Sequence, residues 1–275
     1  MLAGCGDEAK EVSPDRLVKA AQTTSAAGSA RFEMRGTMDV PLRHFDFSGE
    51  GVMDSRTQKG RMTIDMPDIG EAAGQDAESW KGEQVMDGFV VYMRIPAFSD
   101  ALGASTPWVK LDLQKASQMQ GLDIGQFSQV NQNDPTQMLR FLRAVSGKVE
   151  DVGGEEVAGV DTTHYRATID LRRYPDTLPP ERREAARESA ERLIEQLGSS
   201  TIPSEVWIDG DDLVRRMRTK FDMKVPTGDG DEVEIGLDFS IDLLEFGVEG
   251  ADFTPPPEDQ VTDVLELQGA GSPTF

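Results

Sequence analysis

The stretch Val233-Glu234-Ile235-Gly236-Leu237-Asp238-Phe239-Ser240-Ile241-Asp242-Leu243 decides the fold of this chain. Apolar residues alternate strictly with polar residues or glycine along it. Successive side chains of a β-strand point to opposite faces, so the pattern predicts a strand with one buried and one solvated face. Strands of this kind are typical of antiparallel sheets.

The same alternation recurs along the chain. In 31–40, Phe32, Met34, Met38 and Val40 share one face, and in 60–67 Met62, Ile64 and Met66 do the same. Weaker alternation is found in 45–54, 85–95, 160–171, 204–209 and 213–224. The turn signals Asp209-Gly210 and Gly228-Asp229-Gly230 join neighbouring segments. These patterns predict one large antiparallel sheet.

Helical signals are fewer. Ser13-Pro14 and Asp134-Pro135 each precede apolar residues at helical spacing, and a longer helix is predicted from Pro179-Pro180 to Gly198. The segment 113–127 is expected to be partly helical. We therefore predict an α+β fold in which several helices cover the concave face of a large curved sheet, because a wide sheet with a single apolar face must twist and curl.

The chain is expected to divide into three parts. Residues 1–12 form a tether, 13–253 a single domain, and 254–275 a Pro-rich C-terminal tail that begins near Thr254-Pro255-Pro256-Pro257. The polar, Gly/Ala-rich residues 68–79 are expected to be a loop between strands that could gate a cavity.

Leu2-Ala3-Gly4-Cys5 matches a lipobox, the site at which bacterial secretory precursors gain a lipid on cysteine. Cys5 is the only cysteine in the chain, and a polar stretch suited to a tether follows it. We therefore expect Cys5 to carry acyl chains such as palmitate and to anchor the protein extracytoplasmically on a cell membrane. Only Met1 precedes the motif, so the basic and apolar regions of a secretory signal are not seen. A chance match is the alternative.

Composition narrows the range of partners. The 28 basic and 50 acidic side chains give a net charge of −22. Such a surface repels phosphate backbones, which excludes nucleic acid as an expected partner. It also repels anionic headgroups, so the body of the protein should stay off the bilayer while the anchor holds it near. One cysteine allows no internal disulfide.

The inward positions carry several methionines, whose flexible thioethers pack against ligands of variable shape. If helices leave a gap over the concave face, that gap would be an apolar cavity for a hydrophobic ligand. The residues expected to line it are Phe32, Met34, Met38, Phe47, Met62, Ile64, Met66, Val91, Met93, Leu139, Leu142, Leu237 and Phe239. The alternative is that these residues are ordinary core.

The order of these features resembles the LppX/LprG-type cell-envelope lipoproteins of the LolA-like group. The resemblance is carried by the lipobox, the helix leading into a strand from Ser13 to Val40, the strand Thr106-Pro107-Trp108-Val109-Lys110-Leu111-Asp112, and the arm Pro203-Ser204-Glu205-Val206-Trp207-Ile208-Asp209. It implies a half-open β-barrel with helices in its concave side, and carriage of lipids or lipidated molecules. It transfers no catalytic residue.

Catalytic, metal and cofactor chemistry have weak support in the sequence. His44 is expected at a turn and His164 on an exposed face, and no nucleophile elbow, Walker loop or dinucleotide-binding fingerprint occurs. Asp209, Asp211 and Asp212, and likewise Asp229, Asp231 and Glu232, gather at hairpins without EF-hand spacing. We therefore expect no enzyme, no metal and no cofactor.

Two functions remain open. The first is a monomeric, membrane-anchored lipoprotein that binds a lipid or other hydrophobic ligand and carries or presents it in the cell envelope, including the periplasm. The second is a non-catalytic surface interaction or sensor module with a filled core. A cavity of several hundred Å³ between sheet and helices would distinguish them.

Overall fold

The computed structural model describes residues 10–72, 74–119, 146–178, 180–226 and 231–269. The strands are β1 (Lys10–Val12), β2 (Ser29–Val40), β3 (Arg43–Asp54), β4 (Lys59–Asp65), β5 (Lys81–Asp87), β6 (Val90–Arg94), β7 (Trp108–Asp112), β8 (Ser146–Val157), β9 (Val160–Asp170), β10 (Thr201–Asp209), β11 (Val214–Pro226), β12 (Glu232–Phe246) and β13 (Val261–Asp263). The helices are α1 (Asp15–Ala27), α2 (Pro67–Ala72), α3 (Pro96–Ala101), α4 (Leu113–Met119), α7 (Arg183–Leu197) and α8 (Val264–Gly269), with short 3-10 helices η1 (Ala77–Trp80), η2 (Leu171–Thr177), η3 (Pro180–Arg182) and η4 (Glu258–Gln260).

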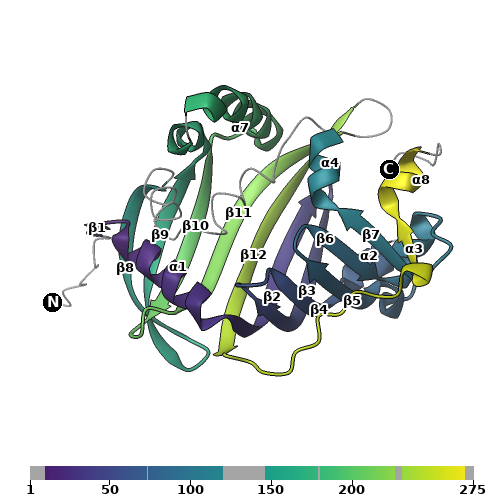
Figure 1. Ribbon diagram of the computed structural model, residues 1–275, viewed down its shortest axis with the longest axis horizontal. Coiled ribbons are helices and arrows are strands. Elements are labelled where there is room, and N and C mark those ends of the chain that lie inside the picture. The colour runs from purple at the N-terminus through teal and green to yellow at the C-terminus, as the bar shows by residue number, and fades with distance from the viewer. Residues whose placement is uncertain (1–9, 73, 120–145, 179, 227–230, 270–275) are drawn as a thin grey trace.

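Within these residues, thirteen strands form one open sheet in the order β1-β8-β9-β10-β11-β12-β2-β3-β4-β5-β6-β7-β13 (Figure 1). Only the pair β7 and β13 runs parallel, whereas the other described neighbours are antiparallel. The predicted fold class, α+β with a large curved antiparallel sheet, is confirmed.

The three best alternating segments of the sequence fall in β12, β2 and β4 as predicted. The weaker segment 85–95 spans two strands, because Gly88 adopts a φ of 62° and reverses the chain between Asp87 and Val90. Glycine reaches this left-handed region at little cost, which a period-two pattern does not reveal.

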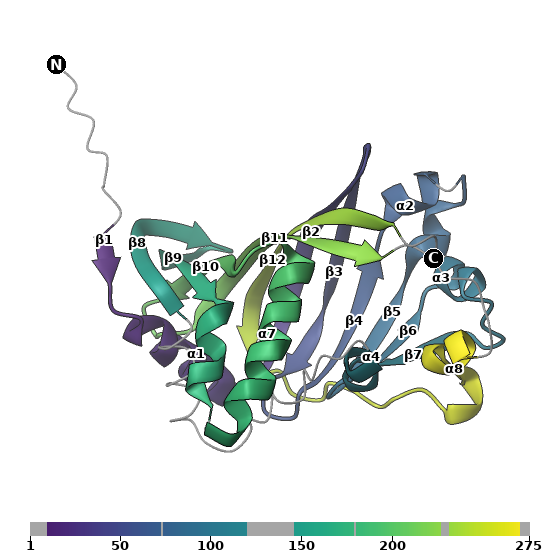
Figure 2. The same ribbon diagram turned by 90° about the horizontal axis from the view of Figure 1, so that it is seen from above.

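Helices α1, α4 and α7 lie on the concave side of the sheet (Figure 2). Helix α1 begins at Asp15, whose N–H donates to the Ser13 hydroxyl over 3.2 Å, and its Ala20 is fully buried against the sheet. Helix α7 ends at the predicted Gly198, which has a φ of 63°. The helix predicted after Asp134 lies outside the described residues.

The prediction of a plain loop over 68–79 was wrong, since α2 and η1 occupy most of it. The Asp76 carboxylate accepts a hydrogen bond from the N–H of Glu78 and so caps η1. The Trp80 indole N–H donates to the Gln75 side chain over 2.8 Å. These contacts connect residues five or fewer positions apart but depend on side-chain geometry rather than periodicity.

The segment after β12 returns along the sheet rather than leaving it. The Arg61 guanidinium on β4 donates to the carbonyl of Thr254 over 3.2 Å. Further on, β13 pairs with β7, and Lys110 on β7 lies 2.9 Å from the carboxylate of Asp263. Residues 254–269 therefore contribute β13 and α8 to the fold.

Glycines occupy inner-face positions where the sheet bends. Gly51 on β3 lies opposite Phe32 and Met62, both of which point inward. A Cβ at Gly51 would meet the carbonyl oxygen of Arg61 and lie 2.7 Å from the Cα of Met62. The backbones of β3 and β4 therefore approach so closely that only glycine fits between them.

The substitution Gly51→Ala should lower the free energy of unfolding by about 1–3 kcal/mol, the usual cost of forcing an extra carbon into filled space. Urea denaturation followed by circular dichroism measures it. Gly154→Ala on β8 is the matched control, because a Cβ there would meet only the carbonyl oxygen of Thr162 at 3.8 Å. Equal stability of the two variants would contradict this account of the bend.

Candidate functional site

The concave face of the sheet carries apolar side chains in rows that cross several strands. Leu237 on β12 lies beside Met38 on β2, and Ile241 lies beside Met34. On β3, Phe45 lies beside Met38 and continues the first row. Gly49 on β3 and then Ile64 on β4 continue the second row from Met34. We call the half-buried members of this face on β12, β2, β3 and β4 the inner apolar wall: Met34, Met38, Phe47, Ile64, Leu237, Phe239 and Ile241.

The predicted lining residues fall into three groups. Phe32, Met62 and Val91 are 3%, 7% and 8% exposed, so the protein's own side chains already cover them. The half-buried members are Met34, Met38, Phe47, Ile64, Met66, Met93, Leu237 and Phe239. Leu139 and Leu142 lie outside the described residues. That any of these residues lines a ligand cavity remains a prediction.

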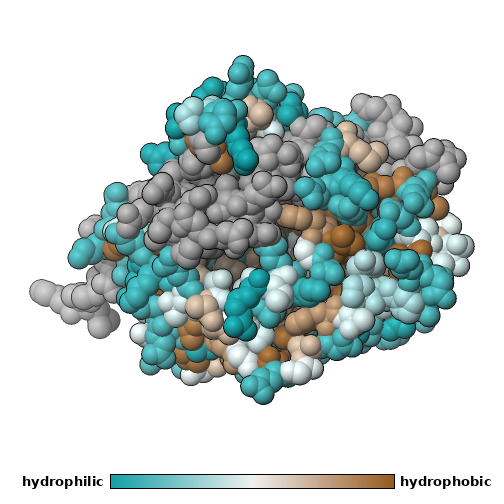
Figure 3. All heavy atoms as spheres, viewed as in Figure 1, coloured by the Kyte–Doolittle hydropathy of each residue, from teal (hydrophilic) through white to brown (hydrophobic). Residues whose placement is uncertain are grey.

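The inner apolar wall presents an uncharged surface to whatever contacts it. Its seven side chains are all apolar, and two of them are unbranched methionines that adapt to the shape of what they touch. Seen from the helix side, apolar surface shows between the polar side chains beside the grey atoms (Figure 3). A half-buried apolar surface of this kind gains free energy when hydrophobic material displaces water from it.

On β11 and β12 the opposite, outer face carries paired charges. The Arg216 guanidinium donates to both carboxylate oxygens of Asp242 at 2.5 and 2.6 Å. One step along the strands, Arg218 holds Asp238 in the same two-point geometry at 2.9 and 2.8 Å. The hydrogen bond that Asp238 accepts from Arg218 lowers the pKa of Asp238, and the hydrogen bond that Arg216 donates to Asp242 raises the pKa of Arg216.

The exposure of the His164 side chain differs from the prediction. The residue lies on the outer face as predicted, but only 13% of its side chain is exposed. Its ring stacks on Trp207 with centroids 4.1 Å apart, and its Nε2 lies 2.9 Å from Glu205. The Trp207 indole N–H donates to Glu155 over 2.7 Å. The prediction of exposure was wrong because cross-strand neighbours cover the ring.

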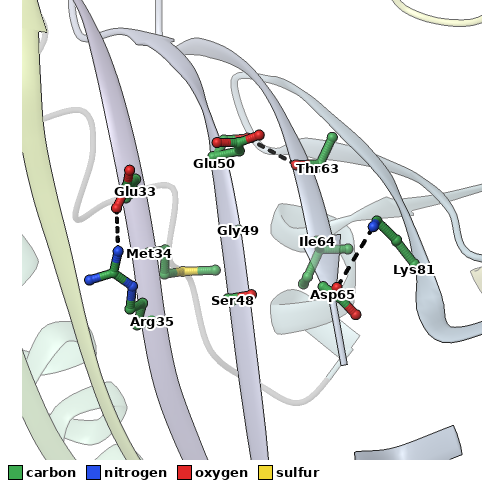
Figure 4. Close-up of a pocket in the computed structure, with 10 residues that line it drawn as sticks. All are labelled: Glu33, Met34, Arg35, Ser48, Gly49, Glu50, Thr63, Ile64, Asp65 and Lys81. Atoms are coloured by element: carbon green, nitrogen blue, oxygen red, sulfur yellow. Dashed lines mark hydrogen bonds and ion pairs between the residues drawn. The ribbon is translucent and has the colours of Figure 1, made fainter. Parts of the chain in front are cut away.

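Two adjoining surface pockets of about 290 and 700 Å³ share the outward residues Arg35, Ser48 and Asp65. Met34 and Ile64 of the inner apolar wall also line the smaller pocket, and Phe47 and Phe239 also line the larger one. The smaller is bordered by the pairs Glu33–Arg35 and Asp65–Lys81 (Figure 4). Arg216, Arg218 and Asp238 line the larger, but their mutual pairing leaves little free charge for a ligand. Sequence reasoning missed these pockets, although the alternation of charges along β2 and β4 pointed to the face that carries them.

The hairpin carboxylates serve the fold. The Asp209 carboxylate accepts hydrogen bonds from the N–H groups of Asp211 and Leu213, and lies 2.6 Å from Arg215. Asp212 pairs with Lys19 and Arg16 of α1. In the part of the chain that the structure describes, no three His, Cys, Asp or Glu side chains gather as a metal would require. Asp229 lies outside it.

Over the same described part, none of the helices has the length and apolar character needed to cross a bilayer.

The strand ends next to the inner apolar wall carry polar side chains. There His44, the second residue of β3, lies 2.6 Å from Asp39 and 3.4 Å from Asp46. The hydrogen bond to Asp39 raises the pKa of His44 above its ordinary 6.5, and the charges of Asp39 and Asp46 add to this effect.

No family model matches this chain. It is 27% identical over 272 residues to an uncharacterized 31.2 kDa protein of Streptomyces griseus, from the rplA–rplJ intergenic region, covering 94% of this chain and 81% of that one.

Among solved structures, the chain is similar to the lipoprotein LppX of Mycobacterium tuberculosis, with 13% identity and a TM-score of 0.49. The similarity covers 88% of this chain and 97% of LppX. It is also similar to LprF of Mycobacterium bovis, with 14% identity and a TM-score of 0.39. This similarity covers 90% of this chain and 99% of LprF. LppX, one of the two proteins that name the family in the sequence resemblance, is thus among the solved structures to which the chain is similar.

Asp39→Asn should lower the pKa of His44 toward 6.5, as followed by NMR titration of the imidazole. Because the folded-state pKa is raised, the pair stabilises the fold below about pH 6.5, and this contribution is lost as the pH rises through the folded value. Asp87→Asn, which removes a partner of Lys59 instead, should leave the pKa unchanged. A His44 pKa at or below 6.5 in the unmodified protein would refute the assignment.

Proposed function

We propose that the chain is a membrane-anchored lipoprotein of the cell envelope that binds a lipid or other hydrophobic ligand between its curved sheet and its helices. The observation that carries this proposal is the inner apolar wall, seven half-buried apolar side chains contiguous on four neighbouring strands. A wall that is merely part of a finished core would be expected to be buried like Phe32 and Met62.

The energetics suit an acyl chain. Moving one CH₂ from water to an apolar site gains about 0.8 kcal/mol. A sixteen-carbon chain would therefore gain roughly 12 kcal/mol before the costs of ordering and association. Binding of this kind needs no charged group and no catalytic chemistry, which agrees with a wall made of apolar side chains alone. The protein would act as a carrier or presenter, as a monomer and without a cofactor.

The anchor in this proposal is Cys5, which lies outside the described residues. Acyl chains on Cys5 would hold the protein at an extracytoplasmic membrane surface, while the net charge of −22 keeps the body away from anionic headgroups. LppX, to which the chain is similar, is a lipoprotein, which agrees with an acyl anchor.

The double substitution Met34→Gln with Met38→Gln should weaken uptake of a fluorescent fatty-acyl probe by about tenfold or more. Placing an amide in an apolar site without a hydrogen-bond partner costs about 1–3 kcal/mol, which corresponds to one to two orders of magnitude in affinity. Fluorescence titration of delipidated protein measures the effect.

The matched control is Arg35→Gln with Thr37→Gln, which changes the outward neighbours on the same strand and should leave uptake intact. Native mass spectrometry of the detergent-free protein should also detect a bound lipid. Absence of any lipid, together with no probe uptake, would reject ligand binding and favour a surface interaction module with a filled core.

Cys5→Ser should move the protein from the membrane fraction to the soluble fraction without changing its unfolding temperature, because it removes only the acylation site. Cell fractionation and thermal denaturation test the two halves of this statement. Retention of the variant at the membrane would show that the anchor lies elsewhere.

A further inference from the structure

The β2–β3 hairpin ends in an exposed leucine with an unfavourable backbone conformation. Val40 pairs with Arg43, so Pro41 and Leu42 alone form the turn. Leu42 is 104% exposed and has a φ of 69°. This left-handed conformation is uncommon for residues other than glycine, asparagine and aspartate, and disfavoured for a bulky apolar side chain.

The turn would tolerate other residues more easily. Proline at its first central position and a positive φ at the second are the pattern of a type II turn, which favours glycine or asparagine where Leu42 stands. Leucine here adds backbone strain and leaves its whole side chain in water. Both costs would be offset if something outside the chain covered Leu42.

The position of the turn points to a membrane. Pairing of β12 with β2 stops at Gly236 and Asp39, so the tip lies beyond the paired part of these two strands. Figure 2 shows the purple tip of this hairpin standing clear of the neighbouring strands. The inward row of β2 that includes Met34 and Met38 runs toward this same end.

We propose that Leu42 inserts into the interface of a lipid bilayer and docks this end of the sheet on the membrane. The inference deepens the proposed function, on which its biological setting rests. A stable protein interface buries about 800 Å² on each partner, far more than one leucine at a hairpin tip supplies. A fluid bilayer needs no complementary shape and accepts a single apolar side chain.

The charges around the tip indicate which bilayer. Asp39 and Asp46 flank His44, and Arg43 donates to the carbonyl of Ala72. Arg43 and His44 offset the two carboxylates at the tip, but the net charge of −22 on the whole chain opposes approach to an anionic surface, so the tip should dock on zwitterionic lipid in preference to anionic lipid. Docking would let a ligand pass between bilayer and inner apolar wall with little exposure to water.

The test uses the full chain with Cys5→Ser, held on phosphatidylcholine vesicles by a polyhistidine tag and a chelating lipid. A polarity-sensitive dye on Leu42→Cys should shift its emission to the blue on tethering, and less on vesicles rich in phosphatidylglycerol. The control is the same dye on Ala158→Cys. Ala158 also has a positive φ, of 49°, but its β8–β9 turn lies at the opposite end of the sheet.

The functional arm measures pickup of a fluorescent lipid from these vesicles. Leu42→Asn, which suits the left-handed turn and should fold normally, should slow pickup about tenfold, because burial of one leucine is worth at least that factor. Ala158→Asn should not slow it. Uptake of a water-soluble lysolipid should be the same in both variants.

Each result decides something different. Absence of a dye shift at position 42, an equal shift at position 158, or unchanged pickup by Leu42→Asn would overturn docking by the tip. If no variant takes up lipid from vesicles or from solution, the proposed function fails, while the dye at position 42 still decides whether the tip enters the bilayer.

Discussion

The bend of the sheet across β2 to β5 is the constraint on which the rest of the structure depends. On the concave side of a curved sheet, inward side chains have less room than outward ones. Gly36, Gly49 and Gly51 all take inward positions, and a Cβ at any of them would come within 3 Å of a neighbouring atom. Without a side chain at these positions, the strands can approach and turn, and α1, α4 and α7 can lie across the inner side (Figure 2).

The two faces of the sheet then take different roles. On the outer face, arginine and aspartate pair across strands, as Arg216 does with Asp242 and Arg218 with Asp238. These pairs satisfy one another and leave the face solvated. The half-buried side chains of the inner apolar wall carry no charge, and they gain only from contact with apolar material. Binding is therefore expected inside and solubility outside.

The candidate site was partly predictable. Period-two alternation placed Met34, Met38, Ile64 and Phe239 on one face, because the side-chain period of a strand is fixed by its backbone. Alternation could not say which inward residues would be fully covered, as Phe32 and Met62 are, since burial depends on which helix packs above each position. Nor could it foresee that Trp207 would cover His164, because these residues are 43 positions apart and meet only through the register of β9 and β10.

The sequence by itself determined that the chain forms a large antiparallel sheet with one apolar face, and where several of its strands and α1 and α7 lie, because periodicity and turn residues act within a few positions. The tertiary structure alone decided the strand order, the parallel pairing of β13 with β7, the helical turns in 67–80 and the exposure of Leu42. These features depend on contacts between distant segments and on individual side-chain and backbone geometries. Both are set only when the whole sheet has assembled and every inward side chain competes for the same limited space.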